Sequence, residues 1–193
     1  MPTKIEWTID TWNPIAGCSK ISEGCRNCYA IKDAVRLAGN ANPKIASKYA
    51  GTTKNNNWTG QINLASDEVL TQPLRWTRPR KIFVNSMSDL FHENVPFEWI
   101  EKIFAVMALC PQHIFQILTK RPERMKEFFD WSDNDFCHEN TLYEFSDYIF
   151  DRNGVKPHLK AAGFGSYSWK DAEGIKETEL LYEGKIPLPN VWL

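Results

Sequence analysis

Three of the five cysteines lie in one short stretch, WNPIAGCSKISEGCRNCY, which runs from Trp12 to Tyr29. They are Cys18, Cys25 and Cys28, with the spacing C-x6-C-x2-C. The stretch also holds Gly17 and Gly24, and glycine lets a short loop bend because it lacks a Cβ atom. Three thiolates on a bent loop converge readily on one soft metal centre. The stretch therefore predicts a metal or cluster site that the other elements have to position.

The ligand count leaves three interpretations of this site open. A four-iron cluster takes four ligands, so three cysteines leave one iron open to a small molecule. A closed zinc site also takes four ligands, and a histidine would have to supply the fourth. The four histidines show no zinc-finger spacing to the cysteines, although His92 is a candidate fourth ligand. The third interpretation is a set of buried thiols or a disulfide, which so tight a loop disfavours.

Strand patterns and helix patterns alternate along the chain. Short, mostly apolar or alternating runs predict strands at 5–10, 81–86 and 113–118. Apolar residues at helical spacing follow each run and predict helices over 28–38, from Pro96 and from Pro122. This order predicts an α/β fold, with a parallel sheet that resembles a partial (β/α) barrel.

The apolar stripes of the three helices predict which side chains are buried. They are Ala30, Ile31, Ala34, Val35 and Ala38 in the first helix, Ile100, Ile103, Phe104 and Met107 in the second, and Met125, Phe128 and Phe129 in the third. Between the first helix and the second strand, Val69, Leu70 and Leu74 predict a short helix interrupted by Pro73.

Ligands of parallel α/β proteins bind where the carboxyl ends of the strands meet. Three predicted loops share that edge, at 8–24, 85–92 and 119–121. They offer hydroxyls, a carboxylate and an ammonium group, which can hold the amine, carboxylate or ribose of a cofactor. The predicted cofactor-binding residues are Ser86, Ser88, Asp89 and Lys120. The alternative is that the Ser and Asp side chains only cap the turn after the strand and that Lys120 is a solvated charge.

Two segments depart from the alternating pattern. Residues 40–60 are polar, include three consecutive asparagines, and predict a long loop. Residues 127–151 contain eight Asp and Glu residues without one Lys or Arg, and predict an acidic amphipathic helix. We therefore predict one α/β domain over 1–193, with an insertion at 131–186.

Three segments resemble a bacteriophage and prophage family known for its three-cysteine motif. They are residues 12–29, 83–92 and 118–125. The resemblance covers most of 4–130 and the last few residues, and the family has no assigned molecular function. It is distantly similar to radical S-adenosylmethionine enzymes of the spore photoproduct lyase type. The usual motif of those enzymes is C-x3-C-x2-C, whereas the first gap here is six residues.

The resemblance implies a cofactor chemistry. Cys18, Cys25 and Cys28 would bind three irons of a [4Fe–4S] cluster, and the methionyl amine and carboxylate of S-adenosylmethionine would bind the fourth. Electron transfer would then cleave the sulfonium to a 5′-deoxyadenosyl radical. Radical enzymes of this type continue through further βα units. The resemblance therefore implies either a chain truncated at its C-terminus or a natural short form, with a partner protein that completes the site.

Composition limits the compartment and the partners. The net charge of −1 and pI near 6.4 argue against a globally basic nucleic-acid binder. The local run from Arg75 to Lys81 holds an aromatic residue among basic ones, which suits phosphate contacts and base stacking, and with the resemblance it makes nucleic acid the expected substrate. We expect a cytoplasmic protein without a membrane partner, because the sequence has no apolar leader and no run of membrane-spanning length.

A second function from a different class fits the same residues. In it the chain is a non-catalytic α/β module, stapled by zinc or by an iron–sulfur site. Its acidic segment binds a partner protein.

Overall fold

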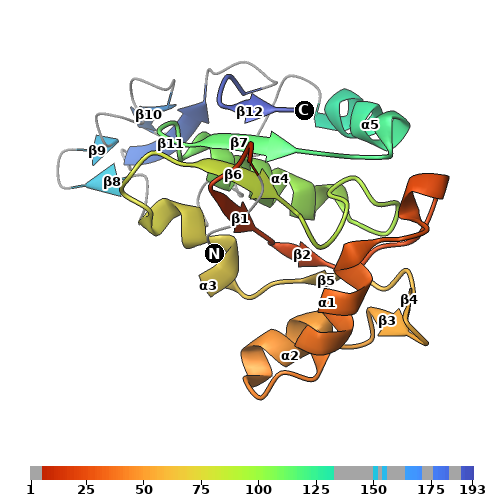
Figure 1. The fold of residues 1–193 in the computed structure, drawn as a ribbon. Helices are drawn as coiled ribbons and strands as arrows, with labels where there is room; N and C mark the ends of the chain where they lie inside the picture. The colour runs from red at the N-terminus through yellow and green to blue at the C-terminus, as the bar shows by residue number, and fades with distance from the viewer. Residues whose placement is uncertain (1–5, 133–149, 152–153, 156–163, 171–175, 183–187) are drawn as a thin grey trace.

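A four-stranded parallel sheet forms the centre of the protein (Figure 1). The structure is a computed structural model, and it describes residues 6–132, 150–151, 154–155, 164–170, 176–182 and 188–193. The strand order is β1 (Asp10–Trp12), β6 (Lys81–Val84), β7 (Ile114–Ile117) and β12 (Val191–Trp192). Because all neighbours run parallel, their carboxyl ends lie at one edge, where the loops to the following helices begin. The predicted α/β class is confirmed.

The unit β6, α4 and β7 contains most of the hydrophobic core. Helix α4 (Phe97–Ala108) follows Pro96, which occupies its N-cap position, and it ends before Leu109. Its predicted stripe is confirmed, because Ile100, Ile103, Phe104 and Met107 are all fully buried. Strand β6 contributes the buried side chains of Ile82 and Val84 to the same cluster.

Helix α5 (Pro122–Ser132) closes this core with aromatic rings. Phe128 is fully buried, and its ring centroid lies 5.3 Å from that of Phe104 and 5.7 Å from that of Phe97. Tilted and edge-on ring pairs at such distances are favourable beyond the area that they bury. Met125 and Phe129 pack against the core as partly buried neighbours, as predicted.

A second, smaller core supports the cysteine stretch. It lies under helix α1 (Tyr29–Ala38) and helix α2 (Pro43–Tyr49) and consists of Ala16, Ala30, Ala34, Tyr49 and Met87. Alanine side chains let the backbones approach closely. The predicted burial of Val35 in the stripe of α1 is wrong, since Val35 is 40% exposed.

The short strands surround this second core as antiparallel pairs. Strand β2 (Ile15–Ala16) pairs with β5 (Asn63–Leu64), and β3 (Thr53–Lys54) pairs with β4 (Asn57–Trp58). Between β5 and β6 the chain forms α3 (Asp67–Leu70) and the 3-10 turn η2 (Gln72–Arg75), which holds Pro73. The interrupted helix predicted there is confirmed.

The predicted long loop at 40–60 is wrong. Asn42 caps α2, since its side chain accepts a hydrogen bond from the Lys44 amide at 3.0 Å, and Pro43 occupies the first turn. Asn55 and Asn56 have φ values of 51° and 54°, which allow the two-residue turn between β3 and β4. The asparagines of this segment are therefore a helix cap and a hairpin turn.

The first strand lies later in the sequence than predicted. Strand β1 begins at Asp10, where the predicted strand ended, and Ile9 is exposed. The fully buried ring of Trp12 anchors it, with the indole Nε1 donating to the Val69 carbonyl at 2.8 Å.

Most of the predicted insertion at 131–186, including the predicted acidic helix, lies outside the described residues. Within it the structure describes two antiparallel pairs, β8 (Phe150–Asp151) with β9 (Gly154–Val155) and β10 (Phe164–Lys170) with β11 (Lys176–Tyr182). The parallel sheet resumes at β12, which pairs with β7. In the described part of the chain, no helix has the length and apolarity needed to cross a membrane.

The burial pattern predicts a contrast between two truncations on helices. Ile103→Ala should lower the free energy of unfolding by about 3 kcal/mol, because it leaves a cavity in the main core. Val35→Ala should change it by less than about 0.5 kcal/mol, because Val35 is exposed. Urea unfolding followed by circular dichroism measures both, and equal losses would contradict the assignment of the core.

Candidate metal centre

The three cysteines lie on the connection from β2 to α1, beside the carboxyl edge of the sheet. Cys18 follows Gly17, which forms a parallel bridge with Ser88 of the loop after β6. Cys25 ends the 3-10 turn η1 (Glu23–Cys25), and Cys28 is the N-cap residue of α1. All three are free thiols of intermediate exposure, so the alternative of a disulfide between them is absent from this structure.

Gly17 fixes the start of this connection. Its φ is 102°, a conformation that L side chains rarely adopt, and a Cβ atom there would lie 2.0 Å from the Gln61 carbonyl oxygen. The backbone is also tied from the other side, where the Gly60 amide donates to the Cys18 carbonyl at 3.2 Å. The bend before Cys18 therefore depends on a residue without a side chain.

The surroundings push the pKa values of two of the thiols in opposite directions. Burial raises the pKa of Cys18, and nearby Asp89 adds to this, while nearby Arg121 opposes it. Burial alone would also raise the pKa of Cys25, but hydrogen bonds from backbone groups of Ile21 and Ser22, from the Ser22 hydroxyl and from Lys120 lower it to about 7. The Cys25 thiol is therefore the more readily ionised of the two, as a metal ligand has to be.

Lys120 brings the loop after β7 to the cysteines. Its Nζ donates to the Cys25 Sγ at 3.5 Å and lies over Gly24, where an added Cβ would meet it at 3.0 Å. Two of the residues that the sequence predicts for this site are thus in contact, although 95 positions separate them.

Asp89 ties the loops after β6 and β7 together. One of its carboxylate oxygens accepts from the Phe91 amide at 3.1 Å and the Thr119 hydroxyl at 2.8 Å. The other accepts from the Lys120 amide and from Arg121 Nη1, both at 3.0 Å. These four bonds fill the acceptor positions of a carboxylate. Asp89 therefore stabilises the edge of the sheet, and a direct cofactor contact from it stays a prediction.

The two predicted serines also hold the cysteine connection. The Ser86 hydroxyl donates to the Asn13 side chain at 3.1 Å, and the Ser88 hydroxyl donates to the Ile15 carbonyl at 3.1 Å. Asn13 and Ile15 lie immediately before the cysteines. These serines thus act on the site through its backbone, and direct contact with a cofactor stays a prediction for them as well.

Arg121 joins the cysteine connection to both loops. Its guanidinium is buried and donates to Asp89 at 3.0 Å, to Glu93 at 2.7 Å and to the Ser19 hydroxyl at 2.8 Å. Three segments that are distant in the sequence therefore share one cation. Arg121 lies in the predicted loop at 119–121, and nothing in the sequence indicated Glu93 or Ser19 as its partners.

His92 is buried within the same network. Its Nδ1 accepts from the Asn94 amide at 3.0 Å, so Nε2 carries the proton of the neutral ring and donates to the Ser19 hydroxyl at 2.9 Å. Burial lowers its pKa, and neighbouring Arg121 lowers it further. Both ring nitrogens are occupied, so in this arrangement His92 does not supply the fourth ligand of a zinc site.

Among the residues that the structure describes, no three His, Cys, Asp or Glu side chains are grouped as ligands of one metal ion. The predicted convergence of Cys18, Cys25 and Cys28 on one centre therefore stays a prediction.

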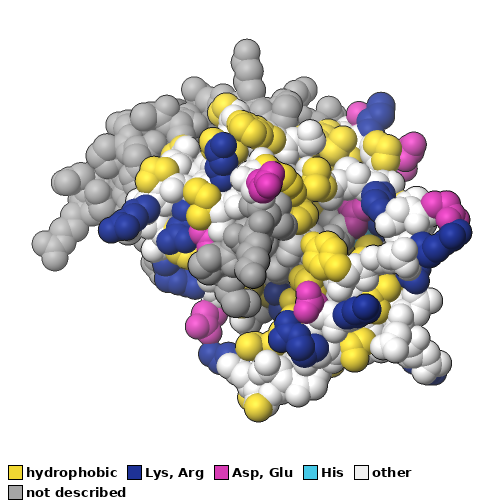
Figure 2. All heavy atoms as spheres, viewed as in Figure 1, with side chains coloured by type: hydrophobic (Ala, Val, Ile, Leu, Met, Phe, Trp, Pro, Cys, Tyr) yellow, Lys and Arg dark blue, Asp and Glu magenta, His cyan; other side chains and the backbone are white. Residues whose placement is uncertain are grey.

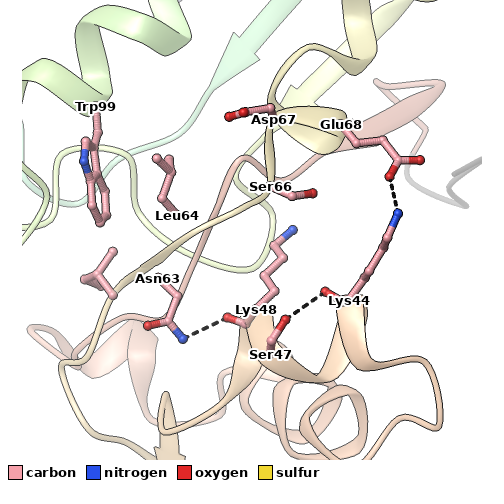
Figure 3. Close-up of a pocket in the computed structure, with 10 residues that line it drawn as sticks. Lys44, Ser47, Lys48, Asn63, Leu64, Ser66, Asp67, Glu68 and Trp99 are labelled. Carbon is pink, nitrogen blue, oxygen red and sulfur yellow. Dashed lines mark hydrogen bonds and ion pairs between the residues drawn. The ribbon is translucent and has the colours of Figure 1, made fainter.

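A separate hollow of about 660 Å³ lies between α2, β5 and α3 (Figure 3). Lys48 lies along it with its amine directed toward Ser66, as Figure 3 shows. Burial lowers the pKa of Lys48 to about 8. Its Nζ donates to the Asn13 carbonyl. Nothing in the sequence pattern indicated Lys48, which supports the start of the cysteine connection from this side.

A family model matches residues 2–193, which is nearly the whole chain. The chain belongs to the DUF5131 family. That family is described as a protein of unknown function. No curated protein and no solved structure matches the chain. The DUF5131 match therefore carries no assigned chemistry, and the site has to be interpreted from its own residues.

The basic run of this DUF5131 chain lies away from the cysteines. It precedes β6, whereas the cysteine connection adjoins the loop that follows β6. Arg75 donates to Thr71 and to the Glu68 carbonyl, and Arg80 pairs with Asp10 and stacks on Trp76 at 4.8 Å. Arg75 therefore supports the α3 segment, and Arg80 holds the amino edge of the sheet at Asp10.

The Arg121 network predicts a large loss of stability when its cation is removed. Arg121→Met should lower the free energy of unfolding of the DUF5131 chain by about 3 kcal/mol at neutral pH, because Asp89 becomes a buried carboxylate without its charge partner. Lys126→Met is the matched control, since the Lys126–Asp130 pair is exposed and should contribute less than about 0.5 kcal/mol. Equal losses in urea unfolding would contradict this account of Arg121.

Glu93 predicts an acid dependence. Burial by itself would raise its pKa, but hydrogen bonds from its backbone amide, Arg121 and Ser19 lower the pKa from 4.5 to about 2. The pKa is lower in the folded state, so Glu93 stabilises the fold above pH 4.5, and this stabilisation disappears as the pH falls toward about 2. The difference in stability between the unsubstituted chain and Glu93→Gln should therefore shrink over that range. A difference that stays constant with pH would contradict the assigned shift.

Proposed function

We propose that this chain is a radical S-adenosylmethionine-like protein in which Cys18, Cys25 and Cys28 bind a [4Fe–4S] cluster. One observation carries the proposal. Three free thiols occupy one connection at the carboxyl edge of a parallel sheet, and Lys120 contacts Cys25, whose pKa is lowered to about 7. The likeness to prophage proteins rests on the same motifs and forms part of the proposal.

The donor set fits an iron–sulfur cluster better than zinc. Thiolates are the usual ligands of both centres, but a closed zinc site needs a fourth ligand, and His92 is occupied by Ser19 and Asn94. A cluster with one open iron needs only three.

A hollow of about 470 Å³ beside Lys120 supports the second half of the proposal. It lies between Ile21 of the cysteine connection and the start of α5, and both Lys120 and Glu123 line it. The methionyl end of S-adenosylmethionine carries an ammonium and a carboxylate. Exposed side chains of both signs, with Lys120 in contact with Cys25, are suited to such a zwitterion.

The residues of this chain would then have separate tasks. The cysteines hold the cluster, Lys120 orients the carboxylate of the bound cofactor, and Asp89 with Arg121 keeps the loops in place. When bound, the cluster supplies the electron that cleaves the sulfonium. Gly17 and the Arg121 network fix the backbone around Cys18, so this ligand is ordered before the cluster binds.

Metal analysis tests the cluster. The chain purified without oxygen should contain iron and sulfide and absorb near about 410 nm, as thiolate-bound clusters do. Cys18→Ala, Cys25→Ala and Cys28→Ala should each lose most of the iron. Cys110→Ala is the matched control, because Cys110 is buried in the main core and should leave the iron content unchanged. Stoichiometric zinc without iron would instead support the non-catalytic module.

Lys120 gives a separate test of cofactor binding. Lys120→Gln should weaken the binding of S-adenosylmethionine about 10-fold, which is within the range for one charge-assisted hydrogen bond, while the iron content stays the same. Lys126→Gln is the control, since Lys126 is an exposed lysine of α5 that pairs with Asp130. Calorimetry on the reconstituted protein measures both. Equal affinities for the two variants would exclude this role of Lys120.

A further inference from the structure

A second hollow adjoins the cysteine connection and differs from the first in charge. It has a volume of about 610 Å³, and Cys28 and Tyr29 line it at the start of α1. Three cations also line it, namely Lys20, Arg26 and Lys32. It shares no lining residue with the hollow beside Lys120. Any molecule bound there would lie against Cys28, one of the three cysteines.

The charge of this hollow favours an anion. Among the described residues that line it, Asp33 is the one carboxylate, and Arg36 already pairs with it at 3.1 Å. Arg26 pairs with Glu23, but both side chains are mostly exposed, and such surface pairs are weak. The first turn of α1 carries no acidic residue, so the positive end of its dipole adds to the cations. Figure 2 shows Lys and Arg side chains, with Asp and Glu side chains among them, on the side of the molecule where α1 lies in Figure 1.

Tyr29 gives the hollow an aromatic surface held in place. Its side chain is 57% exposed, yet its hydroxyl donates to the Ser86 carbonyl at 2.8 Å. An exposed aromatic ring is usually free to change rotamer, whereas this one is fixed at its tip to the loop after β6. A ring that is exposed and ordered is suited to stacking, because little conformational entropy is lost on binding. Bases stack on aromatic side chains irrespective of sequence.

We infer that this hollow binds a nucleotide unit, with its base stacked on Tyr29 and its phosphate held by Lys20, Arg26 and Lys32. The inference deepens the proposed function. Nucleotide binding itself does not depend on the cluster, and only a reaction on the bound nucleotide rests on the proposed function. It assigns nucleic-acid contact to the cysteine connection instead of the basic run at 75–81. The same unit can come from a free nucleotide or from one residue of a single strand.

Fluorescence anisotropy tests the inference with a short 5′-phosphorylated oligothymidylate labelled at its 3′ end. Tyr29→Ala should weaken binding about 10-fold through lost stacking, while Tyr29→Phe, which keeps the ring, should stay within about threefold. Lys32→Gln should weaken binding and reduce the slope of log affinity against log salt by about 1. Arg78→Gln is the matched control, because Arg78 is an exposed cation of the 75–81 run.

Two competitors complete the test. If thymidine 5′-monophosphate displaces the probe at about the concentration at which the unlabelled oligonucleotide does, the ligand is a free nucleotide. If it needs a concentration more than about 100-fold higher, the ligand is a residue of a strand. Inorganic phosphate should compete poorly. Equal competition by phosphate, unchanged binding in Tyr29→Ala and Lys32→Gln, or an equal loss in Arg78→Gln would each overturn the inference. Thermal unfolding by circular dichroism establishes that every variant is folded.

The anisotropy assay is run on the reconstituted full chain and on the same chain after a chelator has removed its iron. The cluster proposal and the nucleotide-binding inference can then fail separately. Nucleotide binding that depends on Tyr29 in a chain that takes up no iron would refute the cluster and leave this inference standing. A chain that holds iron and sulfide but does not bind the probe refutes this inference alone.

Discussion

The buried guanidinium of Arg121 is the interaction on which the arrangement of the site depends. It donates to Asp89 and Glu93 of the loop after β6 and to Ser19, next to Cys18, while its own backbone follows β7. A buried charge is stable only when it is paired, so these three segments have to meet around it. The first cysteine is therefore held at the carboxyl edge of the sheet by electrostatics as well as by its backbone.

The rest of the cysteine connection is supported from two sides and open at its tip. Ser86, Ser88 and Lys48 bind the backbone or side chain of residues 13–15, and the small core under α1 and α2 lies behind them. Gly17 lets Gln61 approach its backbone. By contrast, the turn η1 buries no residue. A fixed base with an exposed tip is an arrangement in which ligands are ordered and a bound molecule can still reach them.

Charge divides the surroundings of the cysteines into two parts. The hollow beside Lys120 carries side chains of both signs, whereas the described lining of the hollow beside Cys28 holds three cations and a single carboxylate that is already paired. In our proposal a zwitterionic cofactor occupies the first hollow and a nucleotide unit the second. The net charge of the whole chain is −1 and conceals this division, because the division depends on which side chains line each hollow.

The sequence by itself determined the α/β class, the buried stripe of α4, the strands β6 and β7 and the three-cysteine connection. Each of these depends on neighbours a few positions away, through helical period or short apolar runs. The cap at Asn42 and the turn at Asn55 and Asn56 were local too, and they were missed because polar residues were interpreted only as a loop. Only the tertiary structure decided the partners of the site, since Lys120 meets Cys25 across 95 positions and Arg121 meets Ser19 across 102. Strand order brings such residues together, and no periodicity along the chain records which loops share an edge.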